Sequence, residues 1–120
     1  MSPQPTILVA DDEPMLRDVI AEFLADEGRV VLTACDSREA MCQLSKQEVD
    51  ILITDIVMPG GMNGFQLARK AKRMRPNLCI IYMSGYYAFE IRDAGPVFGP
   101  VLQKPFRMAA LLTAIGRTVA

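Results

Sequence analysis

The stretch from residue 51 to residue 59 reads ILITDIVMP and largely decides the fold. Its first four residues are apolar or β-branched, which predicts a buried strand over residues 51–54. Asp55 stands at the carboxyl end of that strand, and Pro59 begins a turn that continues through two glycines. The stretch therefore predicts a buried strand with a single carboxylate at its tip.

Similar apolar runs recur along the chain and alternate with segments of helical period. The other four predicted strands cover residues 6–10, 30–34, 78–83 and 101–103. Alternation of this kind indicates repeated strand-helix units, in which a parallel sheet is covered by helices on both faces.

Start and stop signals place the helices between these strands. The first helix begins near Pro14 and ends at Gly28. Asp36, with Glu39 three residues later, resembles a capping box that opens the second helix, and the third helix covers residues 64–74. Residues expected at core spacing are Met15, Val19, Ile20, Phe23 and Leu24 in the first helix, Ala40, Met41 and Leu44 in the second, and Met108, Leu111, Leu112, Ile115 and Val119 in the last.

The segment of residues 86–100 is the least regular, because its two Gly-Pro pairs leave space for only a short helix. Five strands alternating with five helical segments predict a flavodoxin-like, doubly wound α/β fold. We expect a five-stranded parallel sheet in the order 2-1-3-4-5, with a short or irregular fourth helix. A chain of 120 residues fits one domain, residues 1–120.

Composition excludes several classes of function. The chain has no histidine, so histidine-based catalysis and histidine-ligated metals are excluded. A net charge of -1, from 13 basic and 14 acidic residues without long runs, gives no footprint for nucleic acid. Cys35, Cys42 and Cys79 lack metal-ligand spacing, and Cys79 is expected in the core. Because we see neither a signal peptide nor a bilayer-length apolar stretch, we expect a soluble, cytoplasmic protein without membrane contact.

Polar residues that could carry chemistry follow the predicted strands. In open parallel sheets, ligands bind beyond the carboxyl ends of the strands, where the strand order reverses. The residues at these ends are Asp11, Asp12 and Glu13 after the first strand, Asp55 after the third, Ser84 after the fourth and Lys104 after the fifth. The sequence therefore predicts one acidic site that faces a lysine.

Carboxylates gathered at one rim repel one another, so a divalent cation is their natural neutraliser. An all-oxygen donor set favours Mg²⁺ over Zn²⁺, and Mn²⁺ is an expected substitute. We expect Asp12 and Asp55 to be direct ligands, Asp11 to act through water, and the Val57 carbonyl to be a third direct ligand.

A carboxylate that is screened by a cation and faces a lysine can attack a phosphoryl group. Phosphoryl transfer depends mainly on positioning and on charge stabilisation at the equatorial oxygens. We expect the cation to hold one of these oxygens, Lys104 the second, and Ser84 with nearby backbone amides the third.

Four segments together resemble the receiver domains of response regulators over essentially the whole chain: ILVADDE, DILITDIVMP, YMSGY and LQKPF. By this resemblance Asp11 and Asp12 match the acidic pair, Asp55 the phosphorylated aspartate, Ser84 the hydroxyl residue and Lys104 the lysine. The resemblance implies a histidine kinase or a histidine phosphotransfer protein as donor, and a cis Lys104-Pro105 bond. It implies a phosphoacceptor switch that catalyses its own phosphorylation and dephosphorylation at Asp55 with Mg²⁺, rather than a turnover enzyme in the usual sense.

The sequence departs from the family pattern in two places. Val101 stands where the family usually has an aromatic residue that reports phosphorylation, and the segment between Ser84 and Lys104 is slightly short. We infer that the usual output face is altered. The turn MPGGMNG, which has one more residue than the commoner MPxMxG, resembles, together with SGY and LQKPF, receivers that are attached to hybrid histidine kinases or that stand alone.

The residues taken one by one also allow other interpretations. The acidic pair alone could cap the first helix, and the basic residues of the third helix (Arg69, Lys70, Lys72, Arg73 and Arg75) are expected to form a solvated face. Tyr86, Tyr87 and Phe89 are candidate partner contacts. An aspartate-nucleophile phosphatase is a second candidate, but its usual second aspartate is replaced by Val57. A non-catalytic α/β scaffold or nucleotide-binding module is the third, disfavoured because no glycine-rich loop follows the first strand.

Overall fold

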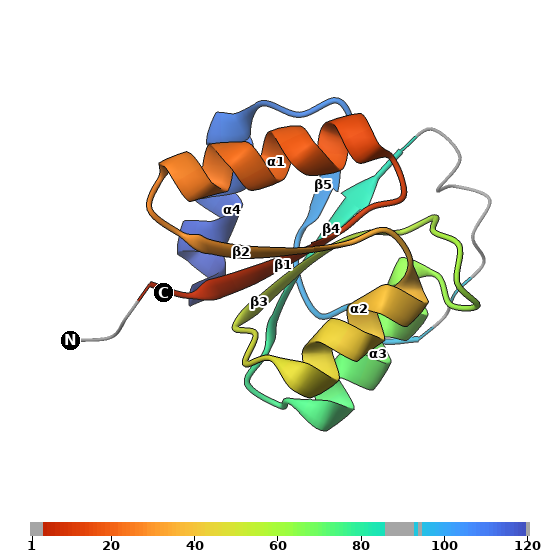
Figure 1. Cartoon of the computed structure of the whole chain (residues 1–120). Helices are drawn as coiled ribbons and strands as arrows, with labels where there is room; N and C mark the ends of the chain where they lie inside the picture. The colour runs from red at the N-terminus through yellow and green to blue at the C-terminus, as the bar shows by residue number, and fades with distance from the viewer. Residues whose placement is uncertain (1–3, 86–92, 94, 120) are drawn as a thin grey trace.

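A computed structural model describes residues 4–85, 93 and 95–119, and five strands and four helices make up this part of the chain (Figure 1). The strands are β1 (Thr6–Ala10), β2 (Val30–Ala34), β3 (Ile51–Asp55), β4 (Cys79–Ser84) and β5 (Val101–Gln103). The helices are α1 (Pro14–Asp26), α2 (Ser37–Lys46), α3 (Gly64–Met74) and α4 (Met108–Val119).

The strands form one parallel sheet in the order β2-β1-β3-β4-β5, so the predicted flavodoxin-like order is confirmed. β1 and β3 are neighbours, and Ala10 pairs with Thr54. Strands are added on one side of β1 and then on the other, which places the switch in strand order between β1 and β3. The carboxyl ends of these two strands therefore meet at the middle of one rim.

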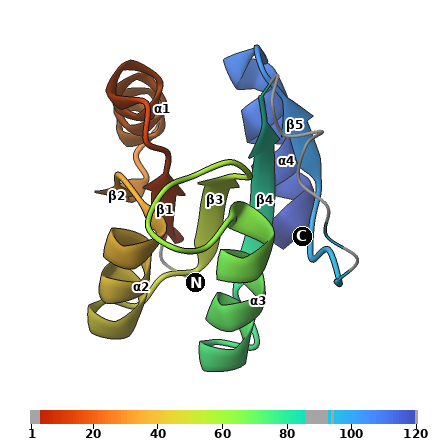
Figure 2. The same ribbon diagram turned by 90° about the vertical axis from the view of Figure 1, so that its right-hand side faces the viewer.

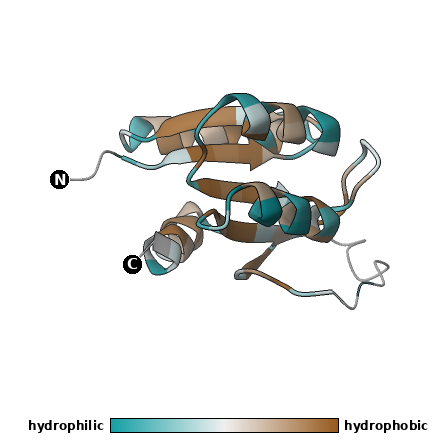
Figure 3. Ribbon diagram, turned by 90° about the horizontal axis from the view of Figure 1, so that it is seen from below, coloured by the Kyte–Doolittle hydropathy of each residue, from teal (hydrophilic) through white to brown (hydrophobic). Residues whose placement is uncertain are grey.

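Two apolar cores lie on opposite faces of the sheet. Helices α1 and α4 cover one face, and α2 and α3 cover the other (Figure 2). Along β1 the side chains alternate, with Ile7 in the core below α1 and α4 and Leu8 in the core below α2 and α3. Both faces are covered, which explains why the strands are largely apolar while polar residues appear on the helices (Figure 3).

Helix ends agree with the capping signals in the sequence. The Asp36 carboxylate accepts a hydrogen bond from the Glu39 amide at 2.7 Å. The Glu39 side chain reaches back to the Cys35 amide at 2.8 Å, rather than to the amide of the capping residue itself. A full capping box between Asn63 and Gln66, which we did not predict, opens α3.

The apolar stripe of α1 is rotated relative to the expected one. Met15 is 79% exposed and Val19 is 53% exposed, so their placement in the core is wrong. Leu16 packs there instead, together with Ile20 and Leu24. Leu16, Ile20 and Leu24 are each four residues apart and lie on one side of the helix, whereas Met15 and Val19 lie about 100° away.

The last helix packs largely as expected. Leu111 and Ile115 are buried, and Met108 and Leu112 pack partly against the same core. The side chain of Val119 lies outside the described part of the chain. Cys79, which was expected in the core, is only half-buried at its edge.

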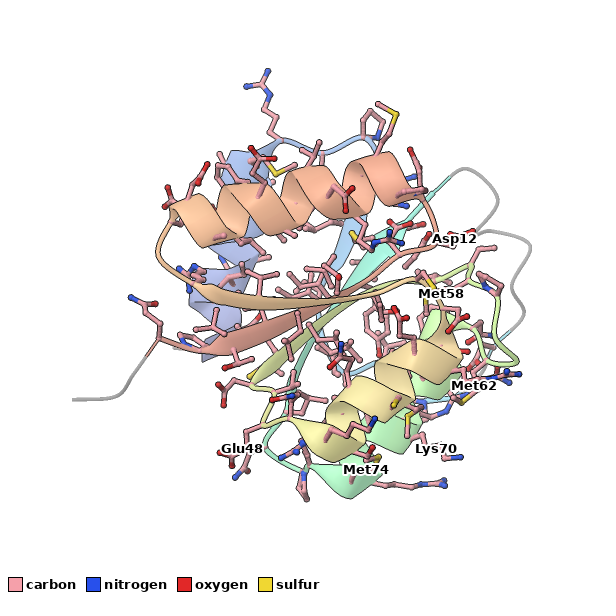
Figure 4. The ribbon with its side chains drawn as sticks, viewed as in Figure 1. Asp12, Glu48, Met58, Met62, Lys70 and Met74 are labelled. Atoms are coloured by element: carbon pink, nitrogen blue, oxygen red, sulfur yellow. The ribbon has the colours of Figure 1, made fainter. Side chains whose placement is uncertain are left out.

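The basic face of α3 is mostly structural rather than solvated. Arg69 forms two 2.9 Å hydrogen bonds with the Asp93 carboxylate. Lys72 donates to the carbonyls of Pro76 and Leu78, and Arg75 donates to the carbonyls of Leu44 and Gln47. Two members of the set, Lys70 and Arg73, are exposed, and Figure 4 shows Lys70 pointing outward from α3.

Part of the irregular segment is attached to the sheet through a tyrosine. Tyr82 is fully buried, and its hydroxyl oxygen accepts a hydrogen bond from the Phe98 amide at 3.1 Å. The expected short helix before Pro100, and the candidate contacts Tyr86, Tyr87 and Phe89, lie outside the described residues. Among the residues that are described, no helix is both long and apolar enough to cross a bilayer.

Replacement of this hydroxyl tests how firmly the segment is held. We expect Tyr82→Phe to lower the free energy of unfolding by about 1–2 kcal/mol, because the Phe98 amide loses its acceptor. Urea denaturation of the two proteins measures the difference. Equal denaturation midpoints and slopes would show that the hydrogen bond contributes nothing.

Candidate functional site

Three carboxylates meet at the middle of the sheet rim. Asp11 and Asp12 follow β1 directly, and Asp55 is the last residue of β3. Each offers an oxygen, and these oxygens all lie within 4.8 Å of one another. Asp11 is fully buried and Asp55 is 6% exposed, whereas Asp12 is exposed and is labelled at the rim in Figure 4. The structure therefore brings together the three acids that the sequence placed at one site.

Lys104 crosses the rim to reach two of these acids. Its ammonium group lies 2.9 Å from Oδ2 of Asp11 and 3.1 Å from Oδ2 of Asp55. The Lys104 amide donates to the Ser84 carbonyl at 2.8 Å, which holds the backbone of Lys104 beside the end of β4. The bond between Lys104 and Pro105 is cis, as the resemblance implied.

The remaining oxygens of Asp11 are also engaged. Its second carboxylate oxygen accepts a hydrogen bond from the Glu13 amide at 2.9 Å, and its backbone carbonyl accepts one from the Arg17 guanidinium at 3.1 Å. Glu13, rather than an aspartate, is the residue that caps α1, and its side chain makes no capping hydrogen bond. Capping of the first helix is thus a minor part of what the acidic pair does. Arg17 was missed in the sequence, where it is one more basic residue on a surface helix.

Ser84 and Val57 also lie at this rim. Ser84 is the last residue of β4, pairs with Gln103 and is half-buried. Val57 lies two residues after Asp55, and its side chain is 39% exposed. The roles expected for the Ser84 hydroxyl and the Val57 carbonyl remain predictions.

The charges of the site are out of balance without a cation. The pKa of Asp55 is raised to about 6, chiefly by burial and also by the neighbouring Asp11, against the opposing effect of Lys104. Burial lowers the pKa of Lys104, but hydrogen bonding and charge from Asp11 and Asp55 outweigh this and leave that pKa above its usual value. One ammonium group thus contacts two of the three carboxylates in the cluster.

This donor set fits a divalent cation. The ligand atoms on offer are oxygens, which Mg²⁺ prefers, and the exposed position of Asp12 leaves room for the water molecules that Mg²⁺ usually retains. The acidic cluster therefore satisfies the chemical requirements of a magnesium site.

The raised pKa of Asp55 gives the metal-free protein a defined pH dependence. Because this pKa is about 6 in the folded protein, against an ordinary value of 3.8, the folded state favours the protonated carboxyl. The contribution of this group to stability is therefore fully present below about pH 4, and it is lost as the pH rises through about 6.

We expect the unfolding free energy of wild type, measured relative to Asp55→Asn in EDTA, to fall by up to about 3 kcal/mol between about pH 4 and about pH 7. Denaturation curves at several pH values give this difference, since groups that do not interact with residue 55 cancel between the two proteins. A difference that does not change with pH contradicts the assignment.

Comparison with known proteins identifies a family. The response regulator receiver domain matches residues 7–116. The transcriptional regulator NtrC of Bradyrhizobium sp. (strain RP501 Parasponia) is 38% identical over 120 residues, which cover 98% of this chain and 25% of that protein. The chain thus spans about a quarter of the length of that relative.

Solved structures agree with the sequence match. A response regulator receiver protein from Sinorhizobium medicae WSM419 has a TM-score of 0.86 and 35% identity, with 97% of this chain and 94% of that chain covered. The response regulator protein TrrA from Thermotoga maritima, solved in complex with Mg(2+)-BeF, has a TM-score of 0.79 and 27% identity, with 96% and 99% covered.

Proposed function

Because this chain belongs to the family of response regulator receiver domains, we propose that Asp55 is the residue that accepts its phosphoryl group. Phosphoacceptor signalling in a two-component system is the function of the chain. The observation that supports Asp55 is its position beside Asp11 and Lys104, where Lys104 Nζ contacts both carboxylates. We infer that residues 1–120 form one receiver domain.

Asp12 and Asp55 are the proposed direct ligands of Mg²⁺, with Asp11 acting through water and Val57 through its carbonyl. When bound, the cation supplies positive charge that neutralises the excess of carboxylates and stabilises charge on the phosphoryl oxygens. The same donor oxygens suit Mn²⁺. The Mg(2+)-BeF complex of TrrA supports this assignment by relationship.

Asp55 then acts as the nucleophile of this site. One of its carboxylate oxygens forms a bond to phosphorus as the phosphorus–nitrogen bond of a phosphohistidine breaks, and the bonding electron pair returns to the imidazole nitrogen. Lys104, which already contacts Asp55, is placed to hold one phosphoryl oxygen. The Ser84 hydroxyl is the proposed donor to another. Lys104 and Ser84 stabilise charge without forming a covalent bond.

The phosphodonor is a histidine kinase or a histidine phosphotransfer protein. We infer that phosphorylation shifts a two-state equilibrium in the surrounding loops, with Ser84 and Lys104 responding to the added charge. A cytoplasmic location is a further prediction. The chain covers only part of relatives such as NtrC.

The proposed function excludes steady turnover of phosphate esters. Val57 occupies the position where an aspartate-nucleophile phosphatase usually has its second acid, so we expect no steady turnover of phosphate esters. A colorimetric assay with p-nitrophenyl phosphate should show no multiple turnover.

Beryllofluoride with Mg²⁺ gives the direct binding test. We expect the amide signals of Asp55, Ser84 and Lys104 in a ¹H-¹⁵N spectrum to shift when beryllofluoride and Mg²⁺ are both present. The shifts should be much smaller with either reagent alone. An unchanged spectrum with both reagents would contradict a phosphoryl site at this rim.

A further inference from the structure

The turn between β3 and α3 (residues 56–63, called here the β3–α3 turn) carries the Val57 carbonyl that we propose as a cation ligand. Its first part is fixed to the sheet. The Ile56 amide donates to the Met83 carbonyl at 3.0 Å, and the Ile56 carbonyl accepts from the Gly64 amide at 2.7 Å. Ile56 and Met58 are buried in the core below α2 and α3. Val57 is therefore held by its neighbours and not by its own exposed side chain.

The second part of the turn contains the extra residue and has to be held in another way. Gly60 and Gly61 have φ values of 104° and 96°, a conformation that favours glycine. Glycine also has the greatest backbone freedom of any residue, so two in succession hold one conformation only at a large entropic cost. A contact from outside the turn is needed to offset that cost.

Ser37, the first residue of α2, makes this contact and is fully buried. Its amide and its hydroxyl both donate to the Pro59 carbonyl, at 3.0 and 3.2 Å. Its hydroxyl oxygen also accepts from the Met62 amide at 3.3 Å. One side chain thus joins the residues on either side of the two glycines.

The packing around Ser37 is tight and its own position is fixed. A Cβ added at Gly60 would lie 2.6 Å from the Ser37 hydroxyl and 2.8 Å from its amide nitrogen. The Asp36 side chain caps α2 by accepting from the Glu39 amide, and Ala40 and Leu44 anchor the helix in the core. Ser37 is therefore a fixed support against which Gly60 packs.

We propose that Ser37 is a positioning residue for the cation site, acting through the β3–α3 turn to hold the Val57 carbonyl at the rim beside Asp12 and Asp55. This inference rests on the proposed function. Its basis is the bridge that the Ser37 hydroxyl forms between Pro59 and Met62. Ser37 itself touches neither the cation nor the phosphoryl group.

The test compares Mg²⁺ affinity with stability in Ser37→Ala. Isothermal titration calorimetry should show a dissociation constant for Mg²⁺ about tenfold higher than that of wild type, which is the size of effect seen when groups supporting metal ligands are removed. Ser45→Ala is the matched control, because Ser45 lies on the same helix, is exposed and bonds only to the Cys42 carbonyl among the described residues. Its affinity should equal that of wild type.

Comparison with a second cation distinguishes a loss of ligand positioning from a general loosening of the fold. Mg²⁺ requires near-ideal octahedral geometry, whereas Ca²⁺ tolerates irregular coordination. We therefore expect Ser37→Ala to lose much more affinity for Mg²⁺ than for Ca²⁺. The melting temperature in EDTA shows whether each variant is folded.

The outcomes distinguish this inference from the function on which it rests. If Ser37→Ala melts at a lower temperature but binds Mg²⁺ with wild-type affinity, Ser37 has only a structural role and the proposal is overturned. Equal losses for Mg²⁺ and Ca²⁺ overturn it as well. If wild type itself binds no Mg²⁺, the proposed cation site fails first, and the positioning role fails with it.

Discussion

Asp55→Asn should abolish phosphorylation of this chain completely. In acetyl phosphate or phosphoramidate with Mg²⁺, wild type should gain one acid-labile phosphoryl group, seen in the intact mass, and the variant should gain none. The amide of asparagine is not nucleophilic enough to attack phosphorus, and its neutral side chain is a weaker cation ligand. The expected effect is a loss of the whole signal rather than a reduced rate.

This loss should occur in a well-folded protein. The Asp55→Asn substitution removes a nearly buried negative charge, and burial is what raises the pKa of that carboxyl. At about pH 7.5, where the wild-type carboxylate is ionised, the metal-free variant should therefore be at least as resistant to urea as wild type. Loss of phosphorylation then reports on the nucleophile and not on the fold.

Asp26→Asn is the matched control, since Asp26 is an exposed aspartate at the end of α1. It makes the same chemical change away from the rim and should leave phosphorylation unaltered. Persistent incorporation in Asp55→Asn, with the phosphoryl group mapped to Asp12 or Asp11, would move the nucleophile to a different carboxylate.

The strands and the convergence of the acids were predictable from the sequence for a physical reason. A strand buried on both faces must be apolar throughout, so a charged residue directly after it marks the rim. Asp55 as the last residue of β3 and Asp11 directly after β1 both mark the rim, and the parallel pairing of the two strands brings them together. The order of the strands then leaves little freedom for the site.

Features that depend on three-dimensional neighbours were not predictable. The position of Met15 on the exposed side of α1 depends on how the helix is rotated over the sheet, which apolar spacing leaves open by about one residue. Arg69 was assigned to a solvated face because its partner Asp93 lies 24 residues away in sequence. Ser37 gave no signal at all, since its role arises from contacts with Pro59 and Met62, more than 20 residues further along.

Lys104→Met should disable the site in a different way from loss of the nucleophile. Lys104 supplies the ammonium group that contacts both Asp11 and Asp55, and its side chain is 17% exposed. Without it, an equatorial phosphoryl oxygen loses its charged donor. We expect the rate of phosphorylation to fall on the order of 100-fold, which is the cost of removing one such donor from a transition state.

The same substitution should destabilise the metal-free protein and make it more dependent on Mg²⁺. Removal of one partner of a buried ion pair leaves uncompensated charge, but protonation of Asp55, whose pKa is already about 6, limits the penalty. At about pH 7.5 in EDTA we expect a loss of about 1–3 kcal/mol in unfolding free energy. Added Mg²⁺ should restore more stability to the variant than to wild type, since a cation replaces the missing positive charge.

Lys70→Met separates this effect from the general loss of a lysine, because Lys70 is exposed on α3 far from the rim in Figure 4. It should change neither the rate of phosphorylation nor the response to Mg²⁺. If Lys104→Met behaves as Lys70→Met does, the ammonium group contributes little to the charge balance of the site. The carboxylates would then have to be neutralised by the cation alone, and the contacts of Lys104 with Asp11 and Asp55 would be ordinary ion pairs.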